Sequence, residues 1–284
     1  MKLSLVIPVY NYEKRLNEKV EFLSGYFKLS NYDYEIIFVN DGSKDGTIDI
    51  LSKLKPPFKV INQDKNKGKG AAVKAGIEAA SGDYIFFTDI DIPYHLSALD
   101  SAIEHLKSGY EVVLGSRALP DSMSACTRPT DRRLGSKIFS FLANMVLLNK
   151  VQDTQCGFKG FKKHAARNIF KEVRSNGFVF DVELIYHSQK QDFKTKLIPV
   201  HLIDDSESSV KFVRDSIKMA CHLFKLYIRL NTNSFYQFIR YGLMGIYNTL
   251  LNMAIFNLFI FATGISTGKW VGPWRETWAG LSAY

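Results

Sequence analysis

The chain has 284 residues, of which 46% are hydrophobic, and its 37 basic against 28 acidic side chains leave a net charge of +9. This composition excludes wholesale disorder and a fibrous protein. Three cysteines without a Cys-x-x-Cys pair exclude a disulfide framework and a four-cysteine zinc site, and they favour a reducing compartment. At roughly 100–200 residues per domain, the length accommodates one large domain with an appendage or two small domains.

Residues 1–206 alternate between short apolar segments and helical patterns. The apolar run at the start is too short for a secretory signal, so we expect this part to stay in the cytosol. Strands are predicted at 3–9, 35–40, 84–88 and 112–115, and helices at 13–27, 46–54 and 71–80. The alternation predicts an α/β fold with a mostly parallel, Rossmann-like sheet and helices on both faces.

Polar clusters follow the first three predicted strands, where ligands bind in such sheets. They are Pro8 to Asn11, Asn40 to Ser43, and Asp89 to Asp91. Each alone is typical of a turn, but three at successive strand ends predict one ligand site. The two aspartates of the last cluster are separated by one residue, so both can face one Mg²⁺ or Mn²⁺ ion that also binds a diphosphate. Such a metal stabilises charge on a departing nucleotide.

The Gly68-Lys69-Gly70 segment resembles the start of a dinucleotide fingerprint, but Val73 stands at the third glycine position. Two interpretations remain open. The glycines allow the backbone to approach a nucleotide at the start of the next helix, or they form a plain helix-entry turn.

A basic cluster lies between residues 117 and 137, where only two acidic residues occur. Its members are Arg117, Arg128, Arg132, Arg133 and Lys137. The planar fork of arginine suits bidentate phosphate binding. We predict that the four arginines bind a lipid phosphate, with Arg117 and Arg132 as the strongest candidates; the alternative is a solvated basic loop.

Residues 207–232 form the second predicted region, an amphipathic juxtamembrane helix. Between 211 and 230 its apolar side carries Val213, Ile217, Cys221, Phe224 and Ile228, and its basic side carries Arg214, Lys218, Lys225 and Arg229. This pattern is typical of a helix in an anionic membrane interface. A solvated helix that packs on its own domain is the alternative.

Residues 233–284 form the third predicted region, in which no charged residue occurs from 241 to 268. We predict a transmembrane helix at about 241–263, whose 23 residues would extend about 34 Å. Three asparagines in this segment make a buried soluble helix the alternative. Five basic residues lie between Arg214 and Arg240, before the segment, and two follow it, so the positive-inside rule predicts a cytoplasmic N-terminal domain. Trp270, Trp274 and Trp278 suit an interfacial belt or an irregular tail.

The motifs together resemble family 2 glycosyltransferases of the GT-A fold. They are Ile7–Asn11, Asn40–Thr47, Asn66–Gly70, Thr88–Asp91 and Gly115–Arg117. Two further motifs, Asp153–Lys159 and Phe180–Glu183, resemble the polyprenyl-phosphate branch, which includes dolichyl-phosphate glucosyltransferases and dolichol-phosphate mannose synthases. The resemblance covers about residues 3–210. The hydrophobic end resembles the first span of a multi-span membrane domain, here with one predicted span where about four are expected.

The resemblance implies roles for individual residues. The nucleotide-sugar pocket would contain Pro8, Tyr10, Asp41, Lys69 and Asp89, with Asp41 reading the base edge. Asp91, with Asp89, would ligate the metal. The catalytic residues would be Asp91, Asp153 and Arg117, and Asp181 and Glu183 would support the acceptor pocket.

The resemblance also implies an activity: inverting, metal-dependent transfer of a hexose from a nucleotide diphosphate sugar to a polyprenyl or dolichyl phosphate at the cytoplasmic membrane face. The Asp153–Lys159 motif favours UDP-glucose, and GDP-mannose remains open. The acceptor phosphate has a second pKa near 6, so it is already an oxyanion at pH 7. We therefore expect Asp153 to position and stabilise rather than to deprotonate.

Three other function classes compete with this one. A nucleic-acid-binding protein would interleave basic and aromatic residues on one face, which this sequence does not do, so we expect no nucleic-acid partner. A catalytically silent membrane scaffold conflicts with carboxylates at the strand ends. A soluble nucleotidyltransferase leaves the hydrophobic segment unexplained. A homo-oligomer is possible.

Overall fold

The computed structural model describes residues 1–91, 97–122, 130–149, 151–201 and 212–263. Contacts divide the chain into two units, residues 1–227 and 228–284, and each is considered by itself. The region boundaries expected after residues 206 and 232 stay predictions.

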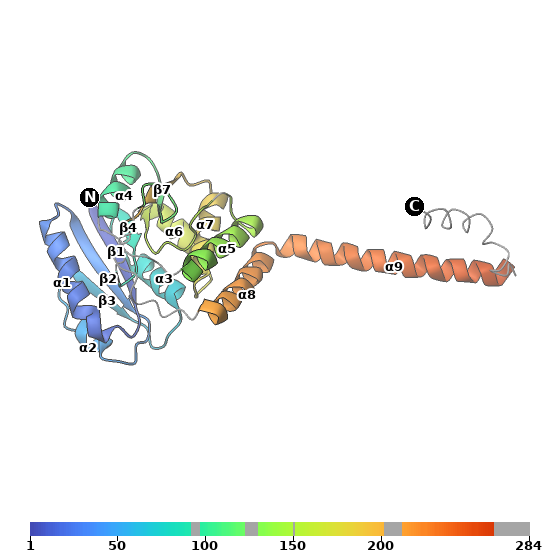
Figure 1. The fold of residues 1–284 in the computed structure, drawn as a ribbon, viewed down its shortest axis with the longest axis horizontal. Coiled ribbons are helices and arrows are strands. Elements are labelled where there is room, and N and C mark those ends of the chain that lie inside the picture. Colours follow the sequence, from blue (N-terminus) through green and yellow to red (C-terminus); the bar gives the residue numbers. More distant parts are fainter. Residues whose placement is uncertain (92–96, 123–129, 150, 202–211, 264–284) are drawn as a thin grey trace. The chain divides into compact units, whose positions relative to one another are not determined.

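A seven-stranded sheet forms the centre of the first unit, with the strand order β3-β2-β1-β4-β6-β5-β7 (Figure 1). The strands are β1 (Lys2–Val9), β2 (Asp33–Asn40), β3 (Phe58–Asn62), β4 (Tyr84–Phe87), β5 (Val112–Ser116), β6 (Lys159–Lys162) and β7 (Thr195–Pro199). Strand β6 is antiparallel to both neighbours, and the other pairs are parallel. The predicted mostly parallel sheet is confirmed, and sequence patterns missed the short strands β3, β6 and β7.

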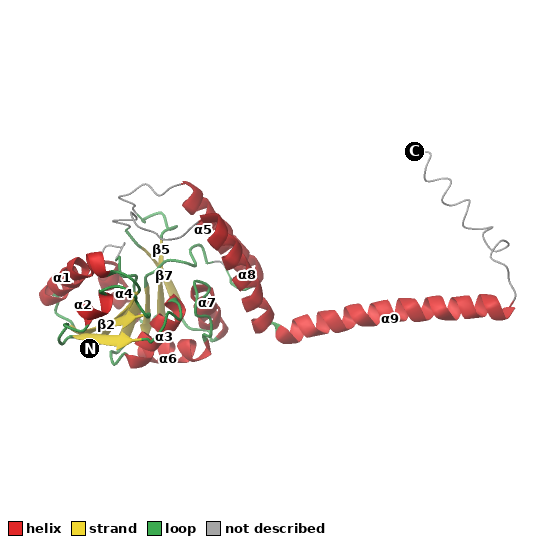
Figure 2. Ribbon diagram, turned by 90° about the horizontal axis from the view of Figure 1, so that it is seen from below, coloured by secondary structure: helices red, strands yellow, loops and turns green. Residues whose placement is uncertain are grey.

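Helices lie on both faces of this sheet, with α5 and α8 farther from it (Figure 2), and eight helices are described besides the one in the second unit. They are α1 (Glu13–Leu29), α2 (Thr47–Leu51), α3 (Lys69–Ala79), α4 (Ser97–Lys107), α5 (Thr130–Val146), α6 (Lys163–Glu172), α7 (Phe180–Lys190) and α8 (Phe212–Leu230). Leu5 and Ile7 of β1 belong to a core cluster with residues of α1 and α4. Val6, on the opposite face of the strand, lies against Gly76 of α3, where a Cβ atom would overlap its side chain. Alternate residues of β1 therefore fill two separate cores, as strand geometry requires.

Helix α8 forms where a helix is expected, and the predicted placement of its apolar side in a membrane interface stays a prediction. Leu223 and Leu226 are buried, whereas Phe224 and Cys221, on the expected apolar side, are exposed. The packing face is set by the neighbouring core rather than by the apolar periodicity of the helix alone. The side chains at 213, 214, 217 and 218 lie outside the described residues.

The second unit contains helix α9 (Thr232–Thr263), whose apolar side chains between Tyr241 and Phe256 are exposed. Within the ranges that the structure describes, no helix is long and apolar enough to cross a membrane. The span predicted at 241–263 is therefore not confirmed, although a helix is present. Asn248, Asn252 and Asn257 interrupt its apolar run.

Candidate functional site

The predicted site residues follow strand ends that meet at one edge of the sheet. Strands β1, β2 and β4 are parallel, and Val9 pairs with Asn40 at the end of the first two. Tyr10 and Asp41 come directly after the ends of β1 and β2, and Asp89 comes two residues after the end of β4. Strand β5 runs in the same direction, and Arg117 follows it. This register places the four residues at one edge of the sheet, and their roles stay predictions.

Side-chain hydrogen bonds tie the loop after β1 to the loop after β2. The Asn11 N–H donates to Ser43 Oγ at 2.9 Å, and the Lys44 N–H donates back to Asn11 Oδ1 at 2.8 Å. The Tyr12 N–H donates to Thr47 Oγ1 at 2.8 Å. These bonds satisfy backbone groups that no strand or helix pairs, so the two loops form one frame. The Tyr10 side chain is exposed beside this frame.

Asp41 is buried and holds the next loop. Its Oδ1 accepts the Lys67 N–H at 2.7 Å and its Oδ2 accepts the Gly68 N–H at 2.9 Å. Gly42, at φ 65°, packs against the backbone of Lys65 and Asn66 so closely that a Cβ atom would overlap it. The predicted base-reading role of Asp41 stays a prediction, because both oxygens accept bonds from the chain itself.

The Gly68-Lys69-Gly70 segment is packed against another part of the protein. A Cβ atom on Gly68 would overlap the Asn176 carbonyl, and one on Gly70 would overlap the Ser175 carbonyl. The Gly70 N–H donates to Asn176 O at 2.7 Å. Gly68 has φ 98°, and helix α3 begins at the next residue. The helix-entry interpretation therefore describes these glycines.

Glu183, an expected support of the acceptor pocket, holds the segment that covers those glycines. Its carboxylate accepts the Arg174 N–H at 3.2 Å and the Ser175 N–H at 2.8 Å. The side chain is buried in α7. Sequence analysis missed the 174–176 segment, and the glycine pair at the start of α3 was the signal that something approaches there.

Lys69 and Asp89 form an ion pair at the strand edge. Lys69 Nζ lies 2.5 Å from Asp89 Oδ1, and the two side chains are 20% and 31% exposed. Burial would lower the pKa of Lys69, but the negative charges of Asp89, Asp181 and Asp91 outweigh it and raise that pKa. Lys69 therefore stays a cation beside any ligand at this edge.

Asp91 supplies an unsatisfied oxygen beside this pair. Its Oδ1 is buried and has no hydrogen-bond partner in the part of the chain that the structure describes. Burial, and then the charge of Asp89, raises the pKa of Asp91 to about 6. No group of three or more His, Cys, Asp or Glu side chains among the described residues is arranged to hold a metal ion. Two carboxylates with an unused oxygen nevertheless fit Mg²⁺ or Mn²⁺, which take remaining ligands from phosphate and water.

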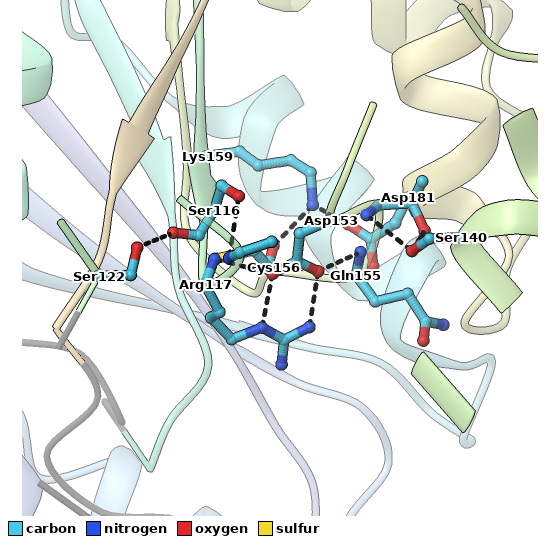
Figure 3. A network of polar contacts seen from close by, with 11 residues as sticks. Ser116, Arg117, Ser122, Ser140, Asp153, Gln155, Cys156, Lys159 and Asp181 are labelled. Atoms are coloured by element: carbon cyan, nitrogen blue, oxygen red, sulfur yellow. Dashed lines mark hydrogen bonds and ion pairs between the residues drawn. The ribbon is translucent and has the colours of Figure 1, made fainter. Parts of the chain in front are cut away.

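Arg117 and Asp153 form a bidentate ion pair (Figure 3). Arg117 Nε lies 2.6 Å from Asp153 Oδ2 and Nη2 lies 2.7 Å from Oδ1; the Arg117 N–H also donates to Oδ2, at 3.0 Å. Burial would raise the pKa of Asp153, but the guanidinium charge outweighs it and lowers that pKa. Arg117 thus binds a carboxylate of its own chain, and its lipid-phosphate role stays a prediction.

A second, fully buried ion pair lies behind the first. Lys159 Nζ lies 2.5 Å from Asp181 Oδ1 and donates to the Cys156 carbonyl at 2.7 Å (Figure 3). The amine also faces the Phe87 ring, 5.3 Å from its centroid. Sequence analysis assigned Asp181 to the acceptor pocket and included Lys159 in a motif, but gave Lys159 no role. The available signal was a lysine within the apolar Gly157–Phe161 run.

The segment that begins at Asp153 also contacts Asp89 and α5. A Cβ atom on Gly157 would overlap the Asp89 carboxylate, so only glycine allows this approach. Ser140 of α5 lies within hydrogen-bond distance of Thr154 Oγ1, at 3.2 Å. Asn144 of α5 donates to the Val151 carbonyl at 2.6 Å.

Several predicted residues cannot be placed. Arg128 and the three tryptophans at 270, 274 and 278 lie outside the described residues. The backbone of Arg132 and Arg133 belongs to α5, but their side chains are outside the described part. Pro8 is the partly buried residue before the last residue of β1.

Relatives of this chain are known glycosyltransferases. A dolichyl-phosphate beta-glucosyltransferase of Trichomonas vaginalis is 31% identical over 238 residues, which cover 79% of this chain and 70% of the relative. The dolichyl-phosphate beta-glucosyltransferase of Drosophila melanogaster is 29% identical over 246 residues, which cover 81% of this chain and 75% of the relative.

A solved structure shares the fold. Glucosyl-3-phosphoglycerate synthase from Mycobacterium tuberculosis, crystallised with Mn²⁺, uridine diphosphate and glucosyl-3-phosphoglycerate, matches with a TM-score of 0.60 and 16% identity over 80% of this chain and 79% of that one. The model of the protein family described as "Glycosyl transferase family 2" matches residues 4–170 of this chain. The chain is a glycosyltransferase and belongs to glycosyl transferase family 2.

Proposed function

We propose that this enzyme transfers glucose, with inversion, from UDP-glucose to the phosphate of a dolichyl or other polyprenyl phosphate. The observation that carries the proposal is the shared strand edge, where the Lys69–Asp89 ion pair and Asp91 lie on one strand end and the Arg117–Asp153 pair follows another. The names of the relatives supply the sugar and the class of acceptor.

The donor side rests on Asp89, Asp91 and Lys69. A divalent cation would be held by the two aspartates, with its remaining ligands from the donor diphosphate. When bound, it supplies positive charge that stabilises the departing nucleotide. Lys69 holds Asp89 in place and adds a second positive charge near the diphosphate. The buried, unpartnered Oδ1 of Asp91 supports the cation assignment.

The acceptor side rests on Arg117 and Asp153. Because a phosphate monoester is an oxyanion at neutral pH, it attacks the sugar carbon without a general base. Asp153 is a poor base here, since both of its oxygens accept bonds from Arg117 and its pKa is lowered. It orients the guanidinium, and the positive charge of Arg117 attracts the acceptor phosphate.

A membrane-facing side of the catalytic unit would deliver the lipid. One face of α5 binds the segment on both sides of Asp153, through Ser140 to Thr154 and through Asn144 to Val151. Ile138, Phe141 and Met145 of the same helix are exposed. Phe224 is exposed on α8, which lies beside α5 in both views (Figures 1 and 2). We assign this apolar face to the surface of the cytoplasmic leaflet, where the polyprenyl chain resides.

The test uses the purified full chain in detergent with Mn²⁺ and dolichyl phosphate. Radiolabelled UDP-glucose or GDP-mannose is added, and organic-extractable product is counted. We expect a lipid-linked product from UDP-glucose, its loss with EDTA, and a β-linked sugar by NMR. Product from GDP-mannose alone contradicts the sugar assignment. No product from either donor, in a folded protein, favours the membrane scaffold.

A further inference from the structure

The topology places one residue between the two halves of the proposed site. Strand β6 lies between β4 and β5, and its first residue, Lys159, pairs with Phe87 on one side and with Leu114 on the other. Asp89 follows Phe87 closely, and Arg117 follows Leu114 closely. Because β6 runs in the opposite direction, it begins at the edge where its neighbours end.

The Lys159 side chain is fully buried, with 1% of its surface exposed. Its amine contacts Asp181 Oδ1 and the Cys156 carbonyl, and it faces the Phe87 ring. Asp181 is buried as well. The lysine thus joins β6, the turn before it and helix α7 through a single charged group.

The turn that Lys159 holds touches both halves of the site. Gly157 lies against the Asp89 carboxylate. The Phe158 carbonyl accepts the Gly115 N–H at 2.9 Å, just before Arg117. Asp153, at the start of the same run, binds Arg117. A shift of this turn would therefore move a donor-side carboxylate and the acceptor-side pair together.

We propose that Lys159 is a positioning residue that holds the 153–158 segment at the spacing which transfer requires. This inference rests on the proposed function. The ion pair gives no reason to expect extra stability, since replacing a buried pair by apolar side chains of similar volume is often neutral or stabilising. Its directional bonds to Asp181 and Cys156 instead fix the geometry of the turn, and a misplacement of about 1 Å at a reacting centre costs about a hundredfold in rate.

The test compares Lys159→Met, Lys159→Arg and the double variant Lys159→Met/Asp181→Leu with wild type. The single Met variant leaves Asp181 as an unpaired buried charge, so it loses stability. The double variant replaces the pair by apolar groups and regains it. Lys163→Met is the matched control, because Lys163 donates to the Ser81 carbonyl at the other end of β6.

Each variant is assayed well below its own melting temperature, with the fold checked by circular dichroism. We measure Mn²⁺–UDP affinity by calorimetry, and kcat and KM for both substrates. In the double variant we expect about tenfold weaker Mn²⁺–UDP binding and about a hundredfold lower kcat, although its melting temperature recovers. Lys159→Arg should recover part of both, and Lys163→Met should match wild type.

Wild-type affinity and kcat in a folded Lys159→Met or double variant would overturn the positioning role. Failure of the proposed function is distinguished from failure of the positioning role by measurements on the wild-type protein. Wild type that binds no Mn²⁺–UDP refutes the donor assignment. Wild type that binds it but forms no glucolipid refutes the acceptor assignment, and the calorimetric comparison still tests Lys159.

Discussion

Two carboxylate clusters, one around Glu35 and one formed by Asp89 and Asp91, lie at opposite edges of the same sheet. At the amino ends of the strands, Glu35 of β2 accepts bonds from Ser4 Oγ at 2.6 Å and from the Ser81 N–H at 2.7 Å, and Lys59 Nζ lies 2.5 Å from its other oxygen. At the carboxyl ends, Asp91 keeps a buried oxygen without a hydrogen-bond partner among the described residues.

The pKa values of Glu35 and Asp91 are shifted in opposite directions, in agreement with these contacts. Burial would raise the pKa of Glu35, but its bonds with Lys59, Ser4 and Ser81 outweigh burial and lower that pKa. Burial and Asp89 raise the pKa of Asp91. Glu35 Oε2 lies beside the ammonium groups of Lys59 and Lys2, at 2.5 and 3.5 Å, whereas no such ion pair is found for Asp91 among the described residues. A carboxylate whose charge is met by cations of its own chain stabilises the fold, whereas one without such a partner at the ligand edge is suited to bind something else.

The largest expected effect is the loss of transfer activity when Asp91 is replaced. Asp91→Asn removes a charged oxygen ligand and should lower kcat/KM for transfer at least about a hundredfold, with weaker Mn²⁺ binding. Steady-state assays over a Mn²⁺ series, with calorimetry, measure this. Unchanged metal dependence in the folded variant would show that Asp91 does not hold the cation.

Asp153→Asn tests the pair that follows β5. An amide cannot accept both Arg117 bonds, so the free energy of unfolding should fall by about 3 kcal/mol, near the low end for broken buried pairs because Arg117 is 20% exposed. We expect a raised acceptor KM and unchanged Mn²⁺–UDP affinity. If turnover vanished while both affinities stayed at their wild-type values, Asp153 would act in the chemical step instead of positioning Arg117.

The Gly157→Ala variant tests whether close packing against Gly157 positions the Asp89 carboxylate. The new Cβ atom would overlap the carboxylate, so the carboxylate must shift, and we expect about tenfold weaker Mn²⁺–UDP binding with a stability loss of about 1–3 kcal/mol. Gly25→Ala in α1 is the control, since nothing lies within 4 Å of its Cβ position. Equal donor affinity in the two variants would mean that Gly157 does not position Asp89.

Glu35→Gln tests the opposite cluster. The unfolding free energy should fall by about 1.5–3 kcal/mol, as for hydrogen bonds to a charged group. The kcat at 25 °C should not change, because the residue lies at the other edge of the sheet. Urea unfolding and transfer assays measure the two effects, and reduced kcat in the folded variant would refute a purely structural Glu35.

The smallest expected effect is the pH dependence of the contribution that Glu35 makes to the free energy of unfolding. The pKa of Glu35 is lower in the folded than in the unfolded protein, so its stabilisation is complete above about pH 5 and is lost as pH falls below about 4. The stability difference between wild type and Glu35→Gln should therefore shrink from pH 7 to pH 3.5 in urea titrations. A constant difference would indicate that the charge of Glu35 contributes nothing.

Much of the fold was predictable because local patterns carry it. The strand that ends at Val9 and the helix that begins at Glu13 appear where apolar runs and polar turns predict them. The short strand β6 was not predictable, since four residues with a buried lysine show no clear periodicity. The residues of α8 that are buried against the protein, Leu223 and Leu226, could not be predicted, because periodicity does not say which neighbour a helix meets.

The candidate site likewise has features that the sequence predicts and features that it does not. Polar clusters at strand ends, from Tyr10 to Asp91, follow from the sequence because parallel strands must end at one edge. The sequence by itself thus determined the α/β frame, the family and the edge of the sheet to which we assign the chemistry. Only the tertiary structure decided that Arg117 pairs with Asp153, 36 residues away, and that Lys159 pairs with Asp181, 22 residues away. The reversed β6 brings these partners together, and pairings at such separations are set by strand order and packing rather than by local pattern.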